Sequence, residues 1–163
     1  MPVEVFRIDD RLIHGQVVVG WGQPLDIGLI VLVDDAVASS DWEQDLYRMG
    51  VPPGMQVQFM DVASAIDALP ALQGDRRRVL LLTGDIHAMQ RLAEGAPAVR
   101  AVNLGGIHHA PDRVQRLRYL FLSPGEEAML RAMAARGLVI SAQDVPASRP
   151  VPLEQVLAGS DLS

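Results

Sequence analysis

The residues best suited to chemistry lie close together near the start of the chain, in residues 7–17, which we call the motif segment. Its sequence is Arg7-Ile8-Asp9-Asp10-Arg11-Leu12-Ile13-His14-Gly15-Gln16-Val17. The segment comes between two apolar runs, where a strand should be followed by a helix. In open α/β sheets, ligands bind at this point, outside the carboxyl ends of the strands. A histidine there, with arginine three residues earlier and glycine directly after it, is suited to chemistry on an anionic group such as phosphate.

Phosphoryl transfer would give each polar residue of the segment a role. An imidazole side chain ordinarily has a pKa of about 6.5 and is partly neutral at pH 7, so a ring nitrogen of a histidine at position 14 can attack phosphorus. Arg11 is suited to hold two phosphoryl oxygens with its planar guanidinium. Gly15 allows close backbone approach, and amides at the following helix start could bind an anion. Asp9 or Asp10 would orient Arg11 or the imidazole.

Every one of these residues also has an ordinary structural interpretation. A histidine beside aspartate and arginine commonly belongs to a surface ion-pair network. Arg7 either pairs with a neighbouring acid or helps bind the anion. Trp21 either packs on a helix face or marks a docking surface. The pair Gly105-Gly106, after an apolar run, either forms a turn or closes the phosphoryl pocket beside the motif segment.

Composition indicates one globular domain over residues 1–163, large enough to bury a core. A net charge of −6 argues against binding to nucleic acid or anionic lipid. The apolar stretches fall short of the roughly 18–20 residues that span a bilayer, and the first residues lack the pattern of a signal peptide. The chain contains no cysteine, which removes disulfides and thiol nucleophiles. We therefore expect a soluble, acidic, cytoplasmic domain without membrane insertion; its oligomeric state stays open, a homo-oligomer included.

Strands and helices alternate along the chain. We expect strands at Val3–Ile8, Ile27–Val33, Gln56–Met60, Val79–Thr83, Ala101–Leu104, Tyr119–Leu122 and Leu138–Ala142. We expect helices at Gly15–Trp21, Asp41–Met49, Val62–Leu72, Asp85–Glu94, Pro124–Arg136 and Leu153–Leu157. Ser40 with Glu43 predicts a capping box, Ser123 predicts an N-cap, and residues 107–118 predict a loop or weak hairpin. This alternation favours an α/β fold: a doubly wound, mostly parallel open sheet of about seven strands with helices on both faces.

The motif segment, followed by Trp21, resembles the IIB subunit of the mannose/fructose/sorbose family of bacterial phosphotransferase systems. The resemblance continues through Val51-Pro52-Pro53-Gly54, Val79-Leu80-Leu81-Leu82-Thr83 and Val102-Asn103-Leu104-Gly105-Gly106, and weakens after Gly106. Several other IIB families carry the phosphoryl group on cysteine, which this chain lacks.

The resemblance implies that His14 takes a phosphoryl group from a phosphohistidine of the IIA subunit. It then gives the group to a hexose held by the membrane subunits IIC and IID. The phosphoryl group would be on Nδ1 of His14, a choice of nitrogen that the sequence alone leaves open. We expect Arg11 and Asp10 to assist directly, and a phosphoryl pocket formed by Asp9, Gly15, Gln16, Arg7, Gly105 and Gly106. We expect no metal and no organic cofactor.

Two further groups of residues have weaker interpretations. The adjacent His108 and His109 point in different directions in a loop and have no third ligand at a recognisable spacing, which argues against a metal site. His108 could instead lie near the motif segment and help hold the phosphoryl group or the sugar. The cluster at residues 76–78 is three arginines, and we interpret it as a solvated turn rather than a partner surface. A positive rim of Arg7 and Arg11 would attract an acidic IIA domain.

The sequence therefore predicts a phosphocarrier domain modified on His14. Two alternatives stay open. The domain could pass the phosphoryl group to a regulatory partner without sugar transport, or it could be a non-catalytic module that binds anions.

Overall fold

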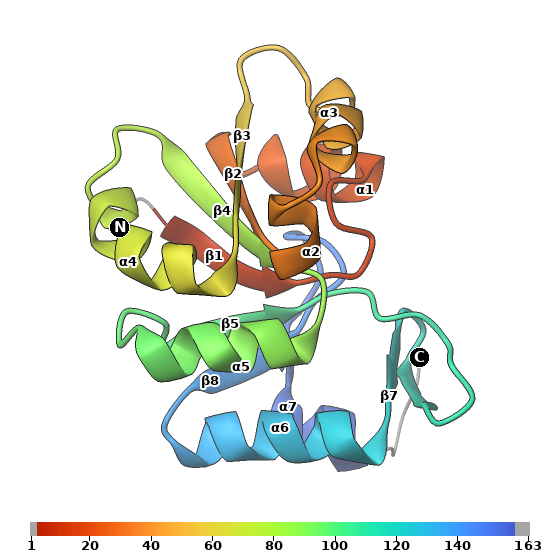
Figure 1. Ribbon diagram of the computed structural model, residues 1–163. Helices are drawn as coiled ribbons and strands as arrows, with labels where there is room; N and C mark the ends of the chain where they lie inside the picture. Colours follow the sequence, from red (N-terminus) through yellow and green to blue (C-terminus); the bar gives the residue numbers. More distant parts are fainter. Residues whose placement is uncertain (1–2, 159–163) are drawn as a thin grey trace.

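The computed structural model describes residues 3–158, apart from the side chain of Gln16, and is built around one seven-stranded sheet (Figure 1). The strand order is β3-β2-β4-β1-β5-β8-β9, and all pairs are parallel except β8 with β9. The strands are β1 (Val3–Ile8), β2 (Ile27–Val33), β3 (Gln56–Met60), β4 (Arg78–Thr83), β5 (Ala101–Leu104), β8 (Val139–Ala142) and β9 (Val151–Pro152). The predicted fold class is confirmed.

Helices cover both faces of this sheet because its central strands are apolar on both sides. Alternate side chains of β2 enter separate cores: Leu29 and Val31 belong to one core, and Ile30 and Leu32 to the other. The first core is closed by α4 (Val62–Gln73), α5 (Ile86–Gly95), α6 (Pro124–Ala135) and α7 (Leu153–Ala158). The second is closed by α1 (Gly15–Val17), the π-helical turn η1 (Val18–Gly22), α2 (Asp35–Ala38) and α3 (Asp41–Met49).

The sheet has the predicted number of strands, but one of them is not the strand that we expected. Residues 120–122 form β7 (Leu120–Leu122), which pairs with β6 (Val114–Leu117) in a separate antiparallel hairpin. The seventh strand of the main sheet is instead β9, next to β8. Its Pro152 has no N–H to donate, which is tolerated in a strand at the edge of a sheet. Because proline usually argues against a strand, the sequence did not predict β9.

Most helices begin and end close to the residues predicted from the sequence, but three differ from the prediction. The short helix α2, which we did not predict, begins after Asp34, whose side chain accepts a hydrogen bond from Val37 N. Helix α4 continues past Pro70 for almost one turn, because Leu69 and Leu72 are buried against the sheet. The helix expected over residues 15–21 becomes one α turn followed by the π turn.

A further departure concerns capping. Ser123 begins α6 with a full capping box: its hydroxyl accepts from Glu126 N, and the Glu126 carboxylate accepts from Ser123 N. The predicted box at Ser40 is wrong, because its side chain makes no capping hydrogen bond to α3.

These two serines predict a difference in stability. Ser123→Ala should lower the free energy of unfolding by about 1 kcal/mol, the usual value of a lost N-cap. Ser40→Ala is the matched control and should change it little, since no capping bond is lost. Urea denaturation followed by circular dichroism measures both, and equal losses for the two variants would contradict the assignment.

Candidate functional site

The motif segment leaves the sheet at its centre and is held by both neighbouring strands. Strand β1 lies between β4 and β5. Just beyond its end, Asp9 N donates to Thr83 O at 2.9 Å, where β4 ends. On the other side, Gly105 N donates to Ile8 O at 2.6 Å, and Asp10 N donates to Gly106 O at 2.9 Å. The segment is therefore fixed at the carboxyl edge of the sheet, where open α/β folds bind ligands.

A buried carboxylate lies between two arginines at the start of the segment. Asp9 is fully buried, and so is Arg7, whose Nη2 lies 3.1 Å from Asp9 Oδ2. Arg11 binds the same carboxylate in a bidentate manner, with Nε 2.8 Å from Oδ1 and Nη2 2.6 Å from Oδ2. A quarter of the Arg11 side chain is exposed. Asp9 therefore joins an arginine inside the protein to an arginine at its surface.

The charges of this cluster stabilise one another. Burial alone would raise the pKa of Asp9, but hydrogen bonds from Arg11 and the charges of Arg7 and Arg11 lower it below its ordinary 3.8. The hydrogen bond to Asp9 raises the pKa of Arg11. Burial lowers the pKa of Arg7, and Asp9 opposes this effect. At neutral pH the cluster holds one negative and two positive charges, so it presents a net positive charge.

Arg7 is anchored by residues that are distant in sequence. Its Nη1 donates to Asn103 Oδ1 and, at 2.9 Å, to Gln143 O. Its guanidinium lies over the ring of Trp21, with Cζ 4.2 Å from the ring centroid, and Trp21 Nε1 donates to Asp144 O at 2.9 Å. Trp21 is thus a buried packing residue. The predicted positive rim of Arg7 and Arg11 is therefore wrong for Arg7, which has no exposed surface.

Gly105 and Gly106 bring the end of β5 against the charged cluster. A Cβ on Gly105 would lie 2.4 Å from Arg7 Nη2 and 2.5 Å from Asp9 Oδ2, so a side chain there would displace the ion pair. A Cβ on Gly106 would lie 3.2 Å from Arg11 Nε. The two glycines therefore do more than form a turn, whereas a role in a phosphoryl pocket stays a prediction. Gly15 differs, because its Cβ position has no neighbour within 4 Å among the described atoms.

His14 lies at the surface, at the end of a tight turn. Leu12 adopts a left-handed backbone conformation with φ of 57°, its N–H donates to Asp9 O, and His14 N donates to Leu12 O. The carbonyl of His14 then accepts from Val18 N at 2.8 Å as the helical segment begins. This geometry exposes the imidazole three residues after Arg11. Gln16 lies in α1, but its side chain is outside the described part of the structure.

Asp10 connects the motif segment to the loop after β5. Its Oδ2 accepts from His108 N at 2.8 Å and also contacts the ring Nδ1 of His108. The carbonyl of His108 accepts from Arg113, which forms a bidentate ion pair with Glu126 of α6. His108 therefore does lie beside the motif segment, held from both sides. The ring of His109 instead packs edge-on against Phe121.

The model of one known family matches this chain over residues 3–162, the PTS system sorbose subfamily IIB component. The chain belongs to that family. It is 30% identical to the N-acetylgalactosamine-specific phosphotransferase enzyme IIB component 2 of Escherichia coli K12, over 96% of this chain and 100% of that protein. It is also 30% identical to the mannose-specific EIIAB component of the same strain, over 89% of this chain but only 45% of that longer protein.

Solved structures of the family have the same fold. The crystal structure of manxB from Thermoanaerobacter tengcongensis is 29% identical, with a TM-score of 0.86 over 96% of this chain and 95% of that one. The IIBSor domain of the sorbose permease from Klebsiella pneumoniae is 24% identical, with a TM-score of 0.87 over both whole chains, which shows the fold alone.

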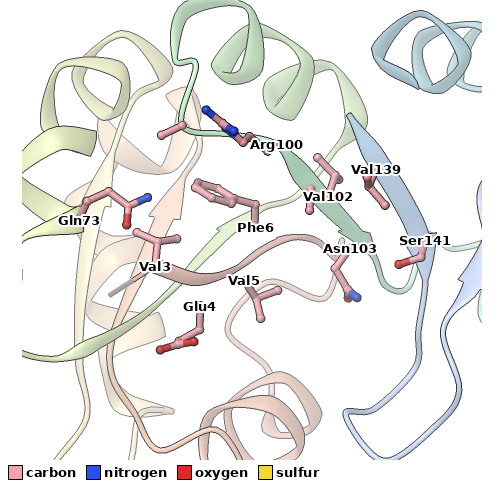
Figure 2. A pocket seen from close by; sticks show the side chains of 12 residues that line it. Val3, Glu4, Val5, Phe6, Gln73, Arg100, Val102, Asn103, Val139 and Ser141 are labelled. Carbon is pink, nitrogen blue, oxygen red and sulfur yellow. The ribbon is translucent and has the colours of Figure 1, made fainter. Parts of the chain in front are cut away.

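Other notable features of this IIB chain lie away from the motif segment. A cleft of about 340 Å³ opens between β1 and β5, which pair only at Arg7–Asn103 and Ile8–Leu104 and diverge toward their amino ends (Figure 2). It is lined by Val3, Phe6, Gln73, Arg100, Val102 and Val139, among others, and by no residue between 8 and 17. The arginines at 76–78 are also at the amino end of β4, where Arg77 pairs with Asp75 and Arg78 with Glu4.

Among residues 3–158 no helix combines the length and apolar character needed to cross a membrane. Within the same range, no group of three or more histidine, aspartate or glutamate side chains could hold a metal ion.

Replacing the central carboxylate should destabilise the fold in a pH-dependent way. Asp9→Asn leaves Arg7 buried without its counter-ion, which should cost about 3–5 kcal/mol at pH 7. Because folding lowers the pKa of Asp9, its ionised form stabilises the fold fully above its ordinary 3.8, and this contribution is lost as the pH falls through the lowered pKa. The difference between the two proteins should therefore shrink below pH 3.8.

Urea denaturation between pH 7 and pH 2.5 measures this difference, with pH values chosen around the ordinary pKa in steps of about 0.5. Asp45→Asn is the control, because the ion pair of Asp45 with Arg48 is exposed and should contribute little. A loss for Asp9→Asn that is the same at every pH, or no larger than the control, would refute the role of the ionised carboxylate.

Proposed function

We propose that this chain carries a phosphoryl group on His14, which it takes from phosphorylated IIA and passes to a hexose during uptake through the membrane subunits IIC and IID. The observation that carries the proposal is the exposed position of His14 at the carboxyl edge of the sheet, three residues after an arginine held by a buried carboxylate. Membership of the IIB family supports it. The proposal places the chain in the cytoplasm, where soluble IIA would reach it.

The first transfer would occur between two imidazoles. The neutral His14 ring attacks phosphorus, a new N–P bond forms, and the N–P bond of the donor histidine breaks with its electron pair returning to that ring. The reaction spreads negative charge over the three phosphoryl oxygens, so positioning and positive charge are the main requirements. We assign the attack to Nδ1 of His14, as the family resemblance implies.

Arg11 would supply the positive charge. Asp9 holds its Nε and Nη2 atoms, which fixes the plane of the guanidinium before the donor arrives. Since a quarter of the side chain is exposed, phosphoryl oxygens can reach it. A pre-oriented cation loses less entropy on binding and needs no rearrangement during the reaction. This supply of charge from the chain itself is why the proposed mechanism requires no metal or organic cofactor.

The remaining residues of the predicted site would act through position. Arg7 has no exposed surface, so we assign it the role of fixing Asp9 rather than contacting phosphate. Asp10 would fix the motif segment to the His108 loop. Gly15, Gly106 and the backbone at Gln16 would border the phosphoryl group. In the second transfer the 6-hydroxyl oxygen of a hexose attacks phosphorus, and the N–P bond breaks with its electron pair returning to the ring. His14 leaves as a neutral imidazole, and the hydroxyl proton is released to water.

Covalent phosphorylation tests the proposal. Incubation with phosphoenolpyruvate, the general phosphotransferase proteins and a cognate IIA should add one phosphoryl group, read by intact mass. The adduct should be labile in acid and stable in alkali. His14→Ala should show no adduct, whereas His87→Gln, which changes another exposed histidine, on α5, should behave as the wild type.

Two outcomes would contradict it. An adduct that persists in His14→Ala would place the phosphoryl group on another residue. Phosphate binding without any covalent adduct in the wild type would instead favour a non-catalytic anion-binding module. Adding membrane vesicles that contain IIC and IID then separates sugar phosphorylation from a regulatory phosphorelay.

A further inference from the structure

Helix α3 has its apolar side chains facing outward. Trp42, Leu46 and Met49 are spaced at i, i+4 and i+7 and therefore share one face of the helix. Their exposed fractions are 69%, 56% and 83%, and no residue of α3 is buried. We call these three residues the α3 stripe. A run of large exposed apolar side chains of this kind is typical of an interaction site.

Hydrogen bonds from Gln44 and an aromatic contact of Tyr47 hold α3 to the rest of the protein. Gln44 donates from Nε2 to Val37 O at 3.0 Å and to Ala38 O at 3.1 Å, at the end of α2. Tyr47 packs against Phe59 of β3, with ring centroids 6.4 Å apart. The helix is therefore fixed in place with its apolar face turned to the outside.

Helix α3 ends beside the residue that precedes His14. Met49 ends the helix, and a Cβ on the next residue, Gly50, would lie 3.9 Å from the carbonyl oxygen of Ile13. Figure 1 shows α3 next to the start of α1, which directly follows His14. The stripe covers seven residue steps of the helix, about 10 Å, so it runs from the vicinity of His14 to Trp42 over that length.

We propose that the α3 stripe is the docking surface for the phosphorylated protein that donates to His14, an inference that rests on the proposed function. Transfer between two histidines needs their nitrogens in line on one phosphorus, so the donor must cover the surface around His14. A transient interface of about 600 Å² on each partner has a radius of about 14 Å, which reaches from His14 to the far end of the stripe. Tryptophan and methionine are enriched at the centres of such interfaces.

The charges around the stripe specify the chemistry of the donor surface. Asp41 and Asp45 are exposed and Glu43 is half-buried on the same helix, and Arg48 is paired with Asp45 at 3.1 Å. Arg7 is buried, and we assign the exposed part of Arg11 to the phosphoryl group, so neither cation of the motif segment is assigned to these acids. A fitting donor therefore has an apolar centre bordered by basic side chains, in place of the acidic surface expected from the sequence. Its basic charge would also steer its approach.

The test measures how the rate of His14 phosphorylation depends on the concentration of phosphorylated IIA. Replacing all three stripe residues by alanine keeps a helix-favouring residue at each position and removes the apolar area. The apparent KM for phosphorylated IIA should rise by about tenfold or more, while the rate at saturating donor stays unchanged. Leu46→Lys should have the same effect, and Val139→Lys, at a valine of β8 that is 68% exposed, should not. Circular dichroism confirms that each variant is folded.

Other results would overturn the inference, and they are distinct from failure of the proposed function. If the wild type is never phosphorylated, the proposed function fails. If all stripe variants are phosphorylated with the wild-type KM, the function stands and the docking surface is wrong. Loss of sugar phosphorylation alone, in vesicles with IIC and IID, would assign the stripe to the membrane acceptor. A change only in sedimentation would assign it to a second copy of this chain.

Discussion

A single buried carboxylate, Asp9, determines how the site is built. An ionised group that is removed from water must be paired and hydrogen-bonded, and Asp9 meets this need with two arginines and the amide of Arg11. One arginine comes from β1 itself and the other from the exposed turn. The pair of bonds from Arg11 therefore extends the rigidity of the sheet centre to the surface. The two bonds to Asp9 fix the plane of the Arg11 guanidinium.

The second buried charge, Arg7, imposes its own constraints on distant parts of the chain. It needs acceptors from Asn103 and Gln143 and an aromatic face from Trp21. Its contact with Asp9 also needs a glycine at position 105, because a Cβ there would occupy the space of the ion pair. The residues that contact Arg7 or Asp9 come from positions as far apart in the chain as 7 and 144. The centre of the sheet and the candidate site therefore share one network.

The sequence predicted most of the fold because its strands and helices have strong local signals. β2 is an uninterrupted apolar run, and its predicted bounds match the structure. β9 was missed because two residues, one of them proline, carry no strand signal, and only pairing with β8 defines it. The capping prediction at Ser40 failed because a favourable sequence pattern does not fix a side-chain rotamer.

The sequence predicted where the site lies, but it did not predict which side chains contact one another there. Strand alternation puts Arg7 on the same face as Val5. That face is buried from solvent at Arg7 only because the turn η1 covers it with Trp21. Asn103 could have indicated a partner for Arg7. It is the only amide side chain in the apolar strand β5, and it lies near the carboxyl end of that strand. The partnership of Asp10 with His108 depends on a loop path that no local pattern specifies. The outward apolar face of α3 likewise becomes visible only when the position of the helix is known.

The role of Arg11 is tested most directly by the single-turnover rate of His14 phosphorylation in Arg11→Lys at saturating phosphorylated IIA. Lysine keeps the charge but cannot make two parallel hydrogen bonds to Asp9 or hold two phosphoryl oxygens in one plane. If a guanidinium held by Asp9 stabilises the transferring group, the rate should fall by about a hundredfold, with folding confirmed separately. A rate within about twofold of the wild type would contradict the account, since the charge alone would then suffice.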